Sequence, residues 1–401
     1  MVNSKAALAL IVFVALALIV TACGGSAAPA NTPAPVVVTS APVVVTSAPV
    51  VQTQVVVVTA TPGAQPTTAS SGSSITINGA GATFPYPLYS RWFYDYAFVD
   101  PAVKFNYQAI GSGGGISQIT AKTVDFGASD AILTDAQLQA APGLHMFPAT
   151  AGGVVPTYNL TGDDGKAITA TIKFPATSLA DIFLGKIKKW NDPVLAQANP
   201  DLKLPNKDII LVHRSDGSGT TFAFTDYLSK ISDTWKSQVG SATSVKWPSG
   251  LGGKGSDGLA GTVAQNDGSL GYVELAYAIQ NKLAYGSVQN KSGNYTMPTT
   301  DAIQAAMADF GTDLGDKLAV SIVNAPGANS WPIATYTYLL FYMDQQDCAK
   351  AQKIVAFYKW AQGPDGQKDE TALQYIPLPD AVKTQALDKL SKMTCQGKPL
   401  Q

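Results

Sequence analysis

Residues Ile209 to Phe222 read IILVHRSDGSGTTF and convert an apolar strand into a helix through a glycine-rich turn. Ser218, Gly219 and Thr220 fall in the first turn of that helix, which then carries apolar residues on one face, namely Phe224, Leu228 and Ile231. At such a junction the unpaired N–H groups of the helix and the positive end of its dipole point to one place. The stretch therefore predicts a position where an anion binds, with ordinary helix capping as the alternative for any single turn.

The segment from Asn78 to Leu88, NGAGATFPYPL, has the same design. Alternating isoleucines indicate a strand just before it, and Pro85 suits the first turn of a helix after it. That helix has one apolar face, because the spacing i, i+4, i+8 joins Leu88, Trp92 and Tyr96. We therefore expect Thr83 and the amide of Phe84 to lie near a helix N-terminus.

A third junction begins with an alternating strand pattern from Val103 to Tyr107, followed by a tight turn from Gly111 to Gly115. Ile116 and Ile119 mark the buried face of the next helix, and Ser112 falls at the position of an N-cap hydroxyl. Three junctions, each with a hydroxyl residue, would form an oxyanion cradle if they met in space. Sequence spacing does not decide whether they do.

Two kinds of charged group suit such a cradle. Arg214 precedes the turn of the first junction, and its planar guanidinium can grip an anion in a bidentate way while Asp216 holds it in place. Asp130 ends the strand-like segment Val124 to Asp130. A carboxylate only accepts hydrogen bonds, so it suits phosphate, which keeps a proton near neutral pH, and disfavours sulfate, which does not. The alternative is that Asp130 is a surface or capping acid.

The N-terminal residues 1–22 predict a signal peptide. An unbroken apolar run extends from Ala6 to Ala22, and the residues from Val20 to Cys23 resemble the bacterial lipobox. We therefore expect a lipoprotein signal peptide, with Cys23 as the lipidated N-terminus of a protein that works outside the cytoplasmic membrane. An ordinary signal peptide with an incidental cysteine and an uncleaved membrane anchor are the alternatives.

Residues 23–74 contain no charged and no aromatic side chain, so they cannot bury enough apolar surface to offset the entropy of ordering them. Within them the sequence APVVVTS at 34–40 recurs at 41–47 and, in altered form, at 48–54. Proline in each repeat excludes a helix. We expect a disordered Pro/Val/Thr-rich tether, with a glycosylated stalk as a weaker alternative. The rest of the chain is long enough for two domains.

The composition excludes one class of partner and one class of site. The 27 Lys and Arg residues against 28 Asp and Glu residues give a net charge of −1, which argues against a nucleic-acid binder. Beyond Cys23 the cysteines are Cys348 and Cys395, and in an oxidising compartment they predict a structural disulfide between the last helices. A reactive thiol pair or a metal site is the alternative, but His145 and His213 lie far from both cysteines in sequence. We therefore expect no metal.

Several enzyme motifs are incomplete in this chain. It has no Gly-x-x-x-x-Gly-Lys-Ser/Thr loop, because Lys254 is followed by Gly255. Residues Gly127 to Ala131 miss the nucleophile elbow at their last position. The rival functions are a phosphate-ester hydrolase, for which no nucleophile or metal set is found, and an adhesive surface lipoprotein, which has no reason to gather oxyanion turns.

Four motifs follow one another in the chain: GAGATFP at 79–85, GSGGG at 111–115, TVDFGASD at 123–130 and RSDGSGT at 214–220. Together they resemble the phosphate-binding protein of the bacterial phosphate-specific ABC transporter, the PstS family, and the likeness runs from about Ile75 to the C-terminus. The resemblance implies an α/β, two-domain periplasmic-binding-protein fold (type II-like), with two α/β lobes joined by a two-crossover hinge. Lobe I would comprise residues 75–155 and 331–401 and lobe II residues 156–330, with crossings near 153–157 and 324–332.

Position by position, the resemblance implies a set of phosphate ligands: Thr83, the Phe84 amide, Ser112, Asp130, Arg214, Ser218, Gly219 and Thr220, with Asp216 supporting Arg214. Gly113 stands where some family members have serine and offers no hydroxyl.

The same resemblance implies a receptor and not an enzyme. It would bind inorganic phosphate without a cofactor and deliver it to the permease subunits of an ABC transporter, and another tetrahedral oxyanion such as arsenate is the runner-up ligand. We further expect a monomer held at the extracytoplasmic face of the cell membrane, in the periplasm or at the cell surface, by the lipid on Cys23.

Overall fold

The computed structural model describes residues 74–400, which belong to one compact unit, Ala69–Gln401. The expected signal peptide, the lipidated Cys23 and the expected tether up to residue 73 lie outside the described residues. Within the described part, no helix combines the length and the apolar character needed to cross a bilayer.

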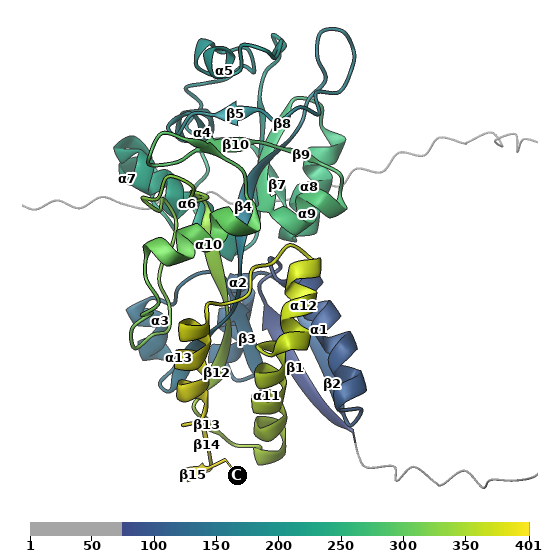
Figure 1. The fold of residues 1–401 in the computed structure, drawn as a ribbon, viewed down its shortest axis with the longest axis vertical. Coiled ribbons are helices and arrows are strands. Elements are labelled where there is room, and N and C mark those ends of the chain that lie inside the picture. The colour runs from purple at the N-terminus through teal and green to yellow at the C-terminus, as the bar shows by residue number, and fades with distance from the viewer. Residues whose placement is uncertain (1–73, 401) are drawn as a thin grey trace, which may run out of the picture. The chain divides into compact units, whose positions relative to one another are not determined.

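The fold is built on one mixed sheet that contains strands from both halves of the described chain (Figure 1). In spatial order its strands are β2 (Val103–Ala109), β1 (Ile75–Gly81), β3 (Phe126–Ser129), β12 (Ala334–Tyr342), β4 (Leu144–Asn159), β8 (Ser269–Glu274), β6 (Ile210–Arg214) and β7 (Leu251–Gly253), with β9 (Ala284–Tyr285) also paired to β4. The strands β2, β1 and β3 run parallel, and so do β8, β6 and β7. Between these two groups, β12 and β4 run antiparallel to their neighbours.

The 16-residue strand β4 belongs to both groups of strands. It pairs with β12 as far as Gly153 and with β8 from Val154 onward. The amide of Val154 donates to the carbonyl of Ile333 over 2.9 Å, and the Trp331 indole donates to the carbonyl of Val154 over 3.2 Å. The two segments that connect the halves of the sheet therefore lie side by side. One lies within the predicted crossing 153–157, and the other lies within or next to the predicted crossing 324–332. The predicted lobe limits themselves stay a prediction.

Helices α1 (Tyr86–Val99), α2 (Ser112–Thr120) and α11 (Cys348–Ala361) pack on the half of the sheet that contains β1. Aromatic rings join α1, β2 and α11, since Phe105 of β2 lies 4.6 Å from Phe93 and 4.5 Å from Phe357 between ring centroids. The predicted apolar face of α1 is confirmed, because Leu88, Trp92 and Tyr96 are buried. The other helices of this half are α3 (Asp135–Ala140), α12 (Pro364–Ala372) and α13 (Asp380–Leu390).

Helices α6 (Gly219–Ile231), α8 (Gly255–Gln265) and α9 (Leu275–Gln280) pack on the half that contains β6 and β8. Phe224 of α6 stacks on Tyr272 of β8 with 4.3 Å between ring centroids. Phe224 and Leu228 are buried as predicted, whereas Ile231 is only partly buried. The remaining elements of this half are α4 (Ser178–Phe183), α5 (Pro193–Ala198), α7 (Asp233–Gln238), α10 (Thr300–Asp309), β5 (Lys173–Phe174), β10 (Ser287–Gln289) and β11 (Tyr295–Thr296).

Cys348 and Cys395 form a disulfide in the structure. The expectation that it joins two helices is wrong. Cys348 opens α11, but Cys395 lies in β14 (Thr394–Cys395), in a small sheet with β13 (Asp344–Gln345) and β15 (Lys398–Pro399). The bond therefore ties the last strands to the start of α11.

Candidate functional site

The three predicted strand–glycine–helix junctions meet between the two halves of the sheet. The amide of Gly113, at the start of α2, donates to the carbonyl of Gly217 over 2.9 Å, and the amide of Gly219, at the start of α6, donates to the Ser112 hydroxyl over 3.0 Å. On the other side, the hydroxyls of Thr83 and Ser256 share a hydrogen bond of 2.8 Å. Segments more than 100 residues apart thus contact one another, which answers the question that spacing left open.

Ser112 does not cap α2, contrary to the sequence-based expectation. The N-cap residue is Gly111, and Ser112 is the first helical residue. Its hydroxyl oxygen instead accepts from the amides of Gly219 and Asp130, at 3.0 and 3.2 Å. Gly111 has φ +89°, and a Cβ there would lie 2.2 Å from Oδ2 of Asp216. Only glycine therefore fits this turn, and the adjacent serine is free to bridge to other segments.

The N-terminus of α6 faces the other junctions. Ser218 is its N-cap residue, and its hydroxyl accepts from the amide of Thr221 over 3.0 Å. Thr220 is 1% exposed, and among the described residues its hydroxyl has no hydrogen-bond partner. A Cβ on Gly219 would lie 2.6 Å from Oδ2 of Asp130. The first turn of α6 therefore points at Asp130 and carries an unused hydroxyl donor.

Arg214 lies at the end of β6, and its side chain is only 2% exposed. Its Nε and Nη2 donate to the two carboxylate oxygens of Asp216 over 2.7 and 2.6 Å, and its Nη1 donates to the Ser256 hydroxyl over 3.3 Å. Burial raises the pKa of Asp216, but the hydrogen bonds and charge of Arg214, helped by the amide of Gly255, outweigh it and hold that pKa below its usual value. Asp216 is therefore ionised and holds the guanidinium in place, as predicted from the sequence.

Asp130 follows directly after β3 and is 2% exposed. Its Oδ1 accepts a hydrogen bond of 2.7 Å from the hydroxyl of Thr337 in β12. Burial raises the pKa of Asp130 to about 7, against the opposing effects of the Thr337 hydroxyl, the Arg214 charge and the Ser112 hydroxyl. The alternative of a surface acid is excluded by this burial.

Thr83 and Phe84, between β1 and α1, are both buried. The carbonyl of Thr83 accepts from the hydroxyl of Tyr277 over 2.5 Å, and the carbonyl of Phe84 accepts from the hydroxyl of Tyr375 over 2.7 Å. The Thr83 hydroxyl also accepts from the amide of Ser256 over 3.2 Å. These bonds fix the backbone of the first junction from two sides.

Sequence reasoning missed two side chains at the site, Ser256 and Thr337. Ser256 lies in the first turn of α8, at a fourth junction in which β7 ends at Gly253 and α8 begins at Gly255. The run of glycines before it was a signal of the same kind as in the other three junctions. Thr337 sits inside a buried strand, and no local pattern singles it out.

The junctions thus gather a cation held by Asp216, a second acid in Asp130, several hydroxyls and helix N-termini in a place closed to water. Arg214, Asp130, Ser112, Ser218, Thr220 and Thr83 are each at most 4% exposed. No group of three or more metal-ligating side chains occurs among the described residues. This arrangement can surround a small anion and can also accept a hydrogen bond from it.

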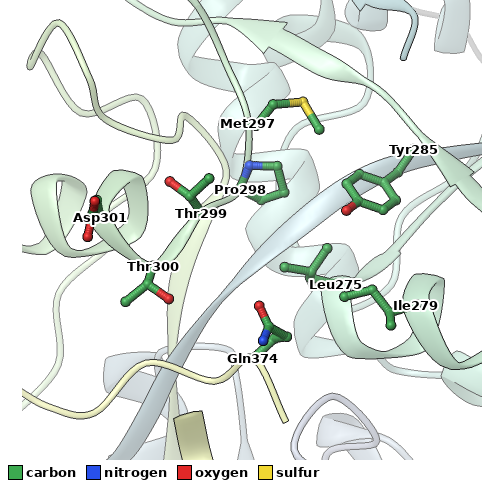
Figure 2. A pocket seen from close by; sticks show the side chains of 9 residues that line it. All are labelled: Leu275, Ile279, Tyr285, Met297, Pro298, Thr299, Thr300, Asp301 and Gln374. Carbon is green, nitrogen blue, oxygen red and sulfur yellow. The ribbon is translucent and has the colours of Figure 1, made fainter. Parts of the chain in front are cut away.

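A separate surface pocket of about 510 Å³ lies elsewhere (Figure 2). Leu275 and Ile279 of α9, Tyr285 and residues 297–301 form its walls, and Gln374 completes it. No lysine or arginine lines it, and Asp301 is its one charged side chain. It does not contain any of the predicted site residues and is poorly suited to an anion.

Comparisons with known proteins agree with one another. A family model described as a PBP superfamily domain matches residues 48–365. Over 315 residues the chain is 47% identical to the phosphate-binding protein PstS of Xylella fastidiosa, covering 78% of this chain and 84% of that protein. Over 311 residues it is 49% identical to PstS of Haemophilus influenzae, covering 77% and 90%. The solved phosphate-binding protein of Stenotrophomonas maltophilia has a similar fold, with a TM-score of 0.59 and 19% identity over 79% of this chain and 94% of that one.

Proposed function

The chain belongs to the PstS family of phosphate-binding proteins, and we propose that it is a receptor that captures inorganic phosphate outside the cytoplasm and delivers it to an ABC transporter for import. It is a binding protein and not an enzyme. The observation that carries the proposal is the joint burial of Arg214 and Asp130, at 4% and 2% exposure, where four helix N-termini meet. A cation and an acid in one closed site match an anion that still carries a proton.

We propose one ligand set for phosphate. It comprises Thr83, the amide of Phe84, Ser112, Asp130, Arg214, Ser218, Gly219 and Thr220, with Asp216 holding Arg214. The unpartnered hydroxyl of Thr220 supports this assignment, because a buried hydroxyl without a partner is unfavourable until a ligand accepts from it. Each hydrogen bond to the anion's charge would contribute about 1.5–3 kcal/mol.

Asp130 provides the selectivity in this proposal. Monohydrogen phosphate donates a hydrogen bond to the carboxylate, whereas sulfate has no proton with which to donate one and would face an unpaired like charge. The direction of the α6 N-terminus toward Oδ2 of Asp130 supports this role. Asp130→Asn should therefore raise sulfate affinity relative to phosphate, and an unchanged ratio measured by calorimetry would exclude Asp130 as the discriminator.

Capture follows closure of two lobes, residues 75–155 with 331–401 and residues 156–330. The change of partner along β4 at Gly153 and Val154 supports a hinge there. Contacts such as Gly219 with Ser112 would form on closure, since they join the two lobes.

Toward the N-terminus of the chain, residues 1–22 are proposed as a signal peptide and Cys23 as the lipid-bearing N-terminus, with residues 23–74 as the tether. The receptor would act as a monomer at the extracytoplasmic face and dock on the permease subunits. Cys23→Ala should abolish the incorporation of labelled fatty acid into the protein, and a variant that still incorporates the label would contradict the anchor.

The decisive experiment is calorimetric titration of the compact unit Ala69–Gln401, stripped of bound ligand, with phosphate and then with sulfate. One-to-one phosphate binding without a sulfate response supports both the site and its acid-based selectivity. Binding of both anions would keep the site and contradict the role of Asp130. Binding of neither would refute the proposed function.

A further inference from the structure

Thr337 lies behind the proposed anion site, at an irregular point of the sheet. It is fully buried in β12, where it pairs with Thr150 of β4. The next residue, Tyr338, pairs with Pro148, so the register shifts between Thr337 and Tyr338. Irregularities of this kind re-aim side chains and often occur next to functional sites.

The two carboxylate oxygens of Asp130 face different neighbours. Oδ1 accepts from the Thr337 hydroxyl over 2.7 Å. Oδ2 faces the first turn of α6, because a Cβ on Gly219 would lie 2.6 Å from it. The carboxyl group of Asp130 is thus oriented with Oδ1 hydrogen-bonded to Thr337 and Oδ2 directed at the N-terminus of α6.

The geometry points to Thr337 as a positioning residue for phosphate recognition, an inference that rests on the proposed function. By donating to Oδ1, Thr337 holds the carboxyl group with Oδ2 toward the first turn of α6, where Oδ2 can accept a hydrogen bond from monohydrogen phosphate. Thr337 itself does not contact the anion.

The hydroxyl of Thr337 also affects which protonation state Asp130 adopts. Burial raises the pKa of Asp130, and the Thr337 hydroxyl lowers it. Without that hydroxyl the acid keeps a proton more readily, and a protonated Oδ2 can donate to a fully deprotonated oxyanion. Loss of the hydroxyl should therefore weaken discrimination against sulfate.

Other titratable groups interact electrostatically with Asp130, so each of them can contribute to a difference in binding between two pH values. Among these groups Arg214 is a cation and Glu274 is an acid. Burial raises the pKa of Glu274 well above its usual value. The rest are buried tyrosines whose pKa values are raised first by burial: Tyr89, Tyr107, Tyr277, Tyr338 and Tyr375. These tyrosines stay neutral between pH 6 and 8, whereas the pKa of Asp130, about 7, lies within that range.

The test compares Thr337→Val, which removes the hydroxyl at nearly constant shape, with Thr337→Ser, which keeps it. The matched control is Thr335→Val, because Thr335 is a buried threonine of the same strand whose hydroxyl donates to the Tyr336 carbonyl, away from Asp130. The full chain, stripped of ligand, is titrated with phosphate and with sulfate at pH 6 and pH 8. Thermal unfolding verifies that each variant is folded, and Thr337→Ala replaces the valine variant if that one is not.

We expect Thr337→Val to raise the ratio of sulfate to phosphate affinity at pH 8 by at least about tenfold, the equivalent of about 1.4 kcal/mol. Thr337→Ser and Thr335→Val should keep the wild-type ratio. In an Asp130→Asn background, Thr337→Val should change the ratio no further, because the two residues act through one carboxyl group.

Three results would overturn the inference. An unchanged ratio in Thr337→Val, a ratio that also shifts in Thr335→Val, or full additivity with Asp130→Asn would each show that Thr337 is merely structural. Failure of the wild-type chain to bind phosphate would instead refute the proposed function, and this inference with it.

Discussion

Arg214→Ala should weaken phosphate binding at least about tenfold, because it removes the one cation of the proposed ligand set. The guanidinium has five N–H donors. Two donate to Asp216 and one to Ser256, which leaves two for an anion. The side chain is 2% exposed, so water screens it little. At about 1.5–3 kcal/mol for each bond to a charged group, loss of one bond corresponds to a factor of about 10 to 150.

The same substitution leaves the carboxylate of Asp216 without its cationic partner, and the charge of Asp216 would then repel the anion as well. The double variant Arg214→Ala, Asp216→Ala separates this repulsion from the direct loss, since it should recover part of the affinity. Lys230→Ala is the matched charge control, because Lys230 lies in the last turn of the same α6 helix, away from the site. It should keep wild-type affinity.

The assay is calorimetric titration of ligand-free protein with phosphate at constant salt, with thermal unfolding as the check on folding. A dissociation constant for folded Arg214→Ala within about threefold of wild type would refute the reasoning, because no bond of the expected strength would then have been lost.

Three further predictions follow from the same contacts. Gly219→Ala should weaken phosphate binding at least about tenfold, since its Cβ would lie 2.6 Å from Oδ2 of Asp130, whereas Gly261→Ala in α8, where the Cβ meets open space, should not change calorimetric affinity. Replacing Cys348 and Cys395 by serine should lower the free energy of unfolding by up to about 4 kcal/mol in denaturant titrations, because the bond closes a separation of 47 residues; a loss below about 1 kcal/mol would contradict a stabilising role. Burial raises the pKa of Asp130 from 3.8 to about 7, so the folded ligand-free chain holds a proton that the unfolded chain loses, and this residue's contribution to stability should fall between pH 4 and 7. Asp130→Asn should flatten that fall in thermal unfolding, and a variant with the wild-type pH slope would argue against a titrating Asp130.

The local elements of the site could be predicted from the sequence because their signals are local. An apolar strand, a glycine turn and an amphipathic helix each leave a pattern within about fifteen residues, and all three predicted junctions formed. The pairing of Arg214 with Asp216 could be predicted for the same reason, since the two residues are only two positions apart in the chain.

Errors and omissions arose where a side chain bonds to a distant segment. Ser112 was expected to cap its own helix, yet it accepts from Gly219, 107 residues away. Thr337 donates to Asp130 across 207 residues, and a threonine in a buried strand carries no periodic signal of such a contact. Cys395 was placed on a helix, although its two-residue strand is stabilised by pairing with β13.

The order of residues along the chain was sufficient to establish that helix N-termini, hydroxyls, an arginine and an acid recur at glycine turns, because turn geometry and helix dipoles depend on neighbouring residues alone. Their meeting depended on the fold, in which β4 passes from one half of the sheet to the other and brings the ends of β1, β2, β3, β6 and β7 together. Burial followed from that meeting, and burial is what raises the pKa of Asp130 and removes water from Arg214. Desolvation is a property of the assembled surroundings, so no stretch of sequence contains it.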